Sequence, residues 1–133
     1  MKLTIPDKVK LYETPISTHW FNELGIFCSV SKKVERKIEH YHELMNLYKS
    51  LSKTGEKFKM LSDATDAMPQ SKEVRELIVS EMPKYIKAHA VLVDKMMENS
   101  LNSTFLRLSW QGYPVMIFTD EKEAIEWLLE FKE

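Results

Sequence analysis

Residues 88–93 read AHAVLV, an almost unbroken apolar run with polar residues on both sides. Such a run is typical of a strand covered on both faces, as in a parallel sheet flanked by helices. Two more runs, Phe58–Leu61 and Tyr113–Phe118, predict further strands. Parallel strands need long crossover connections, and the intervals between these runs are long enough to hold helices. The sequence therefore predicts an α/β domain.

The N-terminal part predicts an antiparallel hairpin ahead of this alternating region. Val9–Phe21 is rich in β-branched and aromatic residues. Pro15 within it indicates an edge strand or a bulge, because proline cannot donate to a ladder. Asn22–Gly25 reads as a turn and Ile26–Val30 as the second strand. We expect one α/β domain over residues 1–133, with a single mixed sheet and the order ββαβαβαβα.

Helices are predicted where apolar residues recur at steps of three and four. The first predicted helix is Lys33–Thr54, and Gly55 ends it. The second is capped by Ser71 and ends near Pro83, and the third is Asn99–Ser109. The last helix starts at Asp120, with Glu123 at capping-box spacing. These helices are expected to cover both faces of the sheet.

Composition indicates a soluble protein and excludes several classes. The chain has 133 residues, of which 44% are hydrophobic and 29% charged, and its net charge is -1. This charge gives no support for a nucleic-acid partner. No apolar run is long enough for a signal peptide or a membrane span, so we expect a cytoplasmic protein without stable membrane insertion. A single cysteine, Cys28, excludes an internal disulfide and is expected in the core.

The sequence contains no recognisable catalytic, metal-binding or cofactor motif. Its glycines are isolated, so it has no phosphate-binding loop. His40 and His42 are two residues apart on a helix and point away from each other. His89 reads as a core or sheet-face histidine, and His19 has no visible partner. We therefore expect no enzymatic activity, no metal and no cofactor.

Acidic residues follow the predicted strands, where ligands bind in open α/β sheets. Asp63, Asp94 and Asp120 each come directly after a strand, and Asp66 follows closely. These aspartates have a structural interpretation, in which they cap helices and stabilise turns. The alternative is a strand-end crevice built by Asp63, Asp66 and Asp94. An enzyme that uses these carboxylates would need two of them paired in a deep pocket.

A soft apolar surface surrounds the predicted third helix. It consists of Met96, Met97, Leu101, Phe105, Leu106 and Trp110. Core packing explains such a surface. The alternative is a surface for a lipophilic ligand or a protein partner, because flexible methionine side chains adapt to varied shapes.

The order of elements and two stretches of sequence carry a family resemblance. The first begins at Phe58 with FKMLSDATDAMPQSKEV, and the second is YPVMIFTDEKEAIEWLLEF, residues 113–131. Lys57–Phe131 resembles a group of small uncharacterised bacterial proteins with the STAS-like fold, the fold of anti-sigma-factor antagonists such as the SpoIIAA-like proteins. The resemblance implies regulation or binding and no catalysis.

In anti-sigma-factor antagonists a serine at the start of the second helix, within a D-S-x-G pattern, is a phosphorylation switch. The resemblance places Ser71 near that position, but Gln70 stands where the pattern has aspartate, and the glycine is absent. Ser71 is therefore a helix cap or a candidate switch.

The first functional hypothesis is a module that docks a protein partner, including a second copy of itself as a dimer. The alternative is a carrier or sensor of a small lipophilic ligand.

Overall fold

One mixed sheet organises the computed structural model, which describes residues 3–52, 54–96 and 113–132. The strands are β1 (Tyr12–Glu13), β2 (Ser17–Phe21), β3 (Phe27–Ser31), β4 (Phe58–Asp63), β5 (Ile86–Leu92) and β6 (Val115–Phe118). They lie side by side in chain order. The pairs β1–β2 and β2–β3 are antiparallel, and β3–β4, β4–β5 and β5–β6 are parallel. The predicted mixed sheet with an N-terminal hairpin is confirmed.

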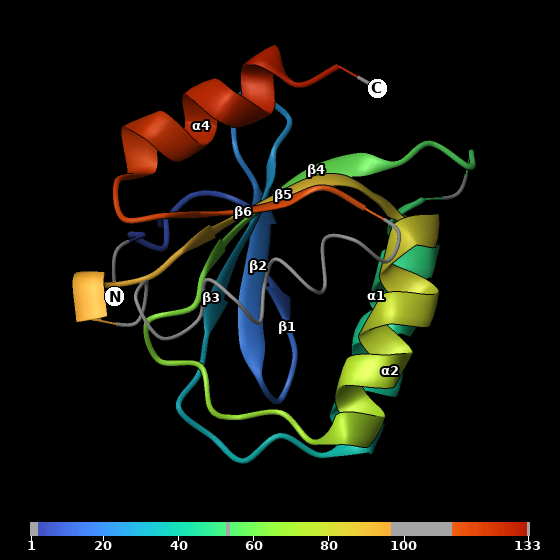
Figure 1. The fold of residues 1–133 in the computed structure, drawn as a ribbon. Helices are drawn as coiled ribbons and strands as arrows, with labels where there is room; N and C mark the ends of the chain where they lie inside the picture. The colour runs from blue at the N-terminus through green and yellow to red at the C-terminus, as the bar shows by residue number, and fades with distance from the viewer. Residues whose placement is uncertain (1–2, 53, 97–112, 133) are drawn as a thin grey trace.

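Helices cover both faces of this sheet, as predicted. In the described part of the chain they are α1 (Ile38–Leu51), α2 (Lys72–Glu81) and α4 (Glu121–Glu130), with a short 3-10 helix η1 (Met82–Lys84) after α2. Figure 1 shows α1 and α2 together on one face and α4 on the other. The helix predicted for Asn99–Ser109 lies outside the described residues.

The prediction of one strand over Val9–Phe21 is wrong, because the chain reverses direction at Pro15. β1 and β2 pair with each other, with Tyr12 opposite His19. The Thr14 hydroxyl accepts a hydrogen bond from the Ser17 backbone N–H at 3.0 Å. Proline fixes its own φ and has no N–H to offer a ladder, so it favours a turn here. The sheet gains one strand over the predicted order.

The first helix also starts later than predicted, at Ile38 instead of Lys33. None of the residues just before it is a good cap, and the Lys37 backbone N–H donates to Nδ1 of His40 at 3.2 Å. The helix covers the stretch whose side chains reach the core: Tyr41, Leu44, Met45 and Tyr48. Gly55 follows with φ +79°, a conformation that favours glycine.

The other two described helices begin where the sequence predicts. The Ser71 hydroxyl accepts from the Val74 backbone N–H at 3.2 Å, and the Asp120 carboxylate accepts from that of Glu123 at 3.1 Å. Each side chain satisfies a backbone donor that the helix itself leaves unpaired. Both predicted caps are confirmed.

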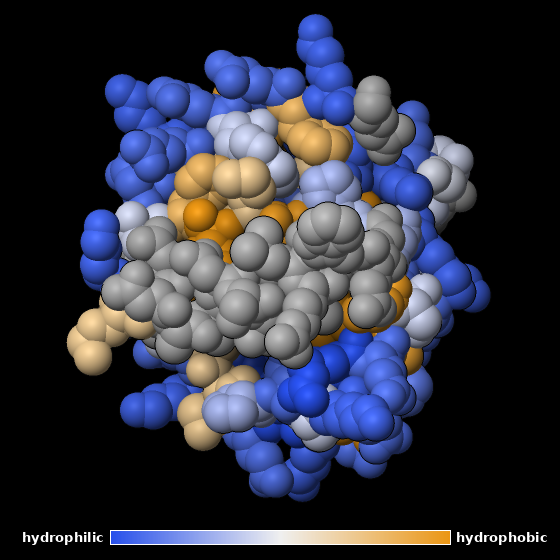
Figure 2. Space-filling model, viewed as in Figure 1, coloured by the Kyte–Doolittle hydropathy of each residue, from blue (hydrophilic) through white to orange (hydrophobic). Residues whose placement is uncertain are grey.

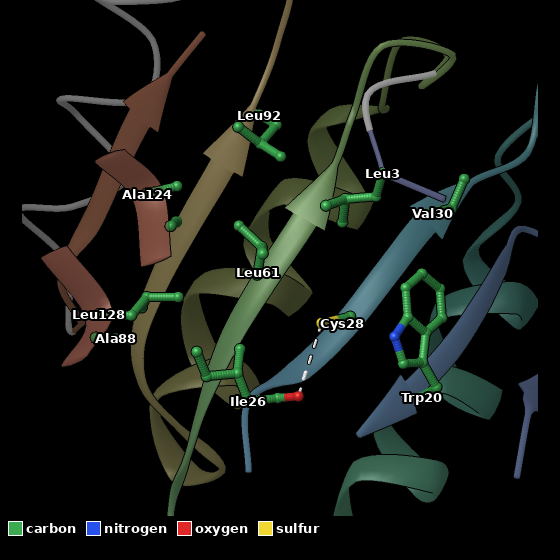
Figure 3. Close-up of a cluster of buried hydrophobic side chains, with 11 residues drawn as sticks. Leu3, Trp20, Ile26, Cys28, Val30, Leu61, Ala88, Leu92, Ala124 and Leu128 are labelled. Atoms are coloured by element: carbon green, nitrogen blue, oxygen red, sulfur yellow. Dashed lines mark hydrogen bonds between the residues drawn. The ribbon is translucent and has the colours of Figure 1, made fainter. Parts of the chain in front are cut away.

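The two faces of the sheet bury different kinds of residue, because neighbouring residues of a strand point to opposite sides. Figure 3 shows the face under α4, where Trp20, Cys28 and Leu61 belong to one apolar cluster with Leu128 of α4. Cys28 is 3% exposed, and burial raises the pKa of its thiol to about 12. The predicted core position of Cys28 is confirmed. The face under α1 and α2 is more polar.

Candidate functional site

A cavity of about 160 Å³ lies between the sheet and the helices α1 and α2. Its apolar walls come from β-strands and helices alike: Ile16, Leu44, Met45, Met60, Ile78, Met82, Val91 and Val115, with the phenol rings of Tyr41, Tyr48 and Tyr113. Sites for small molecules are typically concave and mostly apolar, with a few polar groups that fix orientation.

Polar side chains from four neighbouring strands form a band along the sheet side of this cavity. The band consists of Ser17 and His19 on β2, Ser29 and Ser31 on β3, Ser62 on β4 and His89 on β5. His19 lies opposite Ser29, and Ser29 lies opposite Ser62 in the strand register. The spacing of two residues along each strand keeps these side chains on one face.

Each histidine of the band is paired with a serine. The distance from His19 Nε2 to Ser17 Oγ is 2.6 Å, and that from His89 Nε2 to Ser62 Oγ is 2.7 Å. Nδ1 of each ring is buried and has no hydrogen-bond partner among the described residues. Each ring therefore has a hydrogen-bond partner at Nε2 and none among the described residues at Nδ1, which is its open nitrogen.

Burial lowers the pKa of both His19 and His89 to about 4. The cause is desolvation, which disfavours the charged imidazolium. His19 is completely buried and stacks on the Phe27 ring, with 5.1 Å between centroids. At neutral pH both rings are uncharged, so each offers one N–H donor and one acceptor nitrogen.

Arg36 is the only residue with an ionised side chain at neutral pH among the described residues that line the cavity. One of its terminal nitrogens donates to the Lys32 backbone carbonyl at 3.1 Å. Its Nε is buried and has no partner within the described ranges. Also on the lining, Gln70 Nε2 donates to the Tyr41 hydroxyl at 3.0 Å. The cavity therefore combines apolar walls with one guanidinium and two neutral imidazoles.

In enzymes with a serine nucleophile, the serine hydroxyl is also hydrogen-bonded to a histidine, which acts as its base. A catalytic histidine is normally oriented at its second nitrogen by a third group. In the part of the chain that is described, Nδ1 of His19 and of His89 lacks such a group. The arrangement suits the binding of a molecule that hydrogen-bonds to the open nitrogens.

The predicted strand-end crevice does not coincide with this cavity. Asp63, Asp66, Asp94 and Asp120 are all absent from its described lining. Asp63 is 1% exposed, and its carboxylate accepts from the Leu3 backbone N–H at 2.8 Å and from the Thr65 hydroxyl and N–H. Asp66 and Asp94 are exposed, and Asp120 caps α4. The structure thus gives Asp63 and Asp120 structural roles.

The other predicted site residues lie away from the cavity or outside the described ranges. Ser71 is an exposed cap. Met96 is 85% exposed, whereas Met97, Leu101, Phe105, Leu106 and Trp110 lie outside the described residues. On the face seen in Figure 2, hydrophobic surface is concentrated in the middle of the view and hydrophilic residues dominate the periphery.

Within the described residues, no group of three or more histidine, cysteine, aspartate or glutamate side chains is arranged to hold a metal ion. The described helices include none that is long and apolar enough to cross a bilayer.

Sequence reasoning missed the residues that line the cavity, above all Ser29, Arg36 and Ser62. A signal was present in one strand: Ser29 and Ser31 alternate with apolar residues along FCSVS, residues 27–31, whereas Ser17, Thr18 and His19 are consecutive polar residues. Such alternation predicts a polar face directed at something other than a dry core. The alternation does not reveal which strands are neighbours.

The fold and the cavity define a class: an α/β domain with a mixed sheet and a mostly apolar pocket under two helices, with a polar band on the sheet side of the pocket. A family model described as a domain of unknown function, DUF7793, matches residues 19–132, so the chain belongs to that family. Comparisons with curated proteins and with solved structures find no match.

Proposed function

We propose that this protein is a cytoplasmic, non-enzymatic binding domain of STAS-like type that holds a small, mostly apolar molecule in the cavity under α1 and α2. The observation that carries the proposal is the pair of open imidazole nitrogens on His19 and His89, together with Nε of Arg36. Buried polar atoms in native proteins nearly always have partners. A bound molecule with polar groups would supply the missing ones.

The arrangement of the sheet supports the STAS-like part of this proposal. Strands β3, β4, β5 and β6 are parallel and adjacent in chain order, and a helix connects β3 to β4 and β4 to β5. This is the alternation that the resemblance implies. The proposed ligand, however, sits among β2–β5, α1 and α2, whereas the sequence pointed to the third helix.

A panel of single-ring compounds tests binding: neutral benzamide and benzyl alcohol, anionic benzoate and cationic benzylamine. We expect at least one of them to raise the melting temperature, since a ligand that binds only the folded state stabilises it. In ¹⁵N NMR spectra the same compound should shift Nδ1 of His19 or His89.

His42 provides the control, because it is exposed on α1 and does not line the cavity. The variant His42→Gln should respond to the panel like the natural sequence, and His89→Gln should respond less. Absence of any thermal or NMR response to the whole panel, and of any co-purified small molecule in native mass spectra, contradicts the proposal.

Docking of a protein partner or of a second copy is the second candidate. β6 ends the sheet, and its Met116 is 45% exposed. A terminal strand with apolar side chains is a surface on which another chain can pair. If this face self-associates, sedimentation at increasing concentration should reveal a dimer that Met116→Lys weakens. This candidate is contradicted if the protein stays monomeric at all concentrations and if no partner protein binds the natural sequence more strongly than Met116→Lys.

A further inference from the structure

One side chain sets the formal charge of the described part of the cavity lining. Arg36 carries the only formal charge on the described lining at neutral pH, since the burial that lowers the pKa of His19 and His89 keeps both rings uncharged. The described chain provides no carboxylate in an ion pair with Arg36. Arg36 is half-buried, and its buried Nε lacks a partner within the described residues, which is unfavourable for a polar N–H group.

The guanidinium of Arg36 has one buried N–H group without a hydrogen-bond partner among the described residues. A terminal nitrogen is held by the Lys32 carbonyl at 3.1 Å, while Nε has no partner among the described residues. A planar guanidinium presents its N–H groups as a fork whose geometry matches the two oxygens of a carboxylate. The fixed terminal nitrogen orients that fork.

The volume of the cavity and its apolar walls indicate the size and the polarity of the remaining part of the ligand. The volume is about 160 Å³. An apolar cavity of roughly 150 Å³ accepts one benzene ring. The side chains around it, such as Leu44, Met60 and Ile78, favour an apolar body. A phosphate monoester carries up to two charges at neutral pH, one more than Arg36 neutralises.

We propose that the ligand is a monocarboxylate with an apolar body about the size of one ring, whose carboxylate binds Arg36 and whose body lies between the sheet and helices α1 and α2. This inference rests on the proposed function and names its ligand class. The open imidazole nitrogens of His19 and His89 hydrogen-bond to further polar atoms of the ligand.

Calorimetric titration of the whole protein with benzoate and benzamide, which differ in charge and little in shape, tests the carboxylate. We expect benzoate to bind at least about tenfold more tightly than benzamide, as a charge-assisted hydrogen bond implies. Arg36→Gln should abolish this preference while benzamide still binds, and circular dichroism should show that the variant is folded. Lys33→Gln, which removes an exposed positive charge nearby in the chain, should keep the preference.

Three outcomes would overturn the inference and leave the proposed function standing: equal binding of benzoate and benzamide, a preference that survives in Arg36→Gln, or tighter binding of benzylamine or phenyl phosphate than of benzoate. Binding of none of these probes would overturn the inference, and it would overturn the proposed function as well if native mass spectra show no co-purified small molecule.

Discussion

Burial of His19 and His89 changes how the protein responds to acid. Both rings have a pKa of about 4 in the folded state, against about 6.5 for an unfolded chain. Between these values the unfolded chain binds more protons than the folded one. The contribution of these two histidines to the free energy of unfolding is therefore greatest above pH 6.5 and falls as the pH drops from 6.5 to 4.

The first prediction follows from this difference in pKa. Between pH 6.5 and 4, each histidine should lower the free energy of unfolding by about 3 kcal/mol. In His89→Gln, which does not titrate at residue 89, urea unfolding at a series of pH values should show a correspondingly smaller loss. His42→Gln should show the full loss, since this residue is exposed. A profile for His89→Gln that parallels the natural sequence would contradict the pKa assignment.

Asp63 holds the N-terminal segment against the sheet. Its carboxylate accepts from the Leu3 N–H at 2.8 Å, and Leu3 itself is 4% exposed within the apolar cluster under α4. The side chain that was predicted for a ligand crevice thus fixes a backbone segment sixty positions away in the chain.

The second prediction concerns this contact. Asp63→Asn should lower the free energy of unfolding by about 1–3 kcal/mol, because it weakens charge-assisted hydrogen bonds in a buried place. The Leu3 amide should exchange with deuterium faster than in the natural protein. Asp66→Asn, in the exposed turn that follows, should leave both quantities nearly unchanged. Unaltered exchange at Leu3 in Asp63→Asn would show that Asp63 does not hold the segment.

Caps delimit the helices at the scale of elements. The third prediction is that Ser71→Ala lowers the free energy of unfolding by about 1 kcal/mol, since the Val74 N–H then loses its acceptor. Ser71→Asp should retain the stability, because aspartate caps as well as serine does. Urea unfolding measures both. Ser80→Ala, an exposed position of the same helix, should change stability by only a few tenths of a kcal/mol.

Most elements could be predicted from the sequence because their signals are local. The apolar run in β5 and the cap at Asp120 depend only on residues close in the chain. The reversal at Pro15 was missed, since β-branched residues on both sides of a proline read equally well as one interrupted strand or two. The start of α1 was missed because no capping side chain marks it.

The cavity is formed by residues far apart in the chain, so it could not be predicted from the sequence. His19, Ser29, Ser62 and His89 come from four strands, so their proximity depends on strand order and register. A single sequence shows that polar residues alternate along a strand, and the fold alone determines which strands bring those residues together.

The fourth prediction contrasts the two faces of the sheet. Leu61→Ala, in the dry cluster under α4, should lower the free energy of unfolding by about 2–5 kcal/mol through loss of packing. Ser29→Val, in the polar band, should raise it by about 0.5–2 kcal/mol in the ligand-free protein and weaken binding of ring-sized probes. Thermal unfolding and calorimetric titration measure the two effects. A destabilised Ser29→Val that binds probes normally would contradict the assignment of this face.

The difference between the polar and the apolar face of the sheet also favours the observed pairing of β2 with β3. Sliding either strand by a single position would exchange its two faces. His19 and Ser29 would then enter the hydrocarbon layer beneath α4, while Trp20 and Cys28 would turn toward the pocket. The hydroxyls and imidazoles of this face therefore favour one register of the sheet, because a shift of one residue would bury them among apolar side chains.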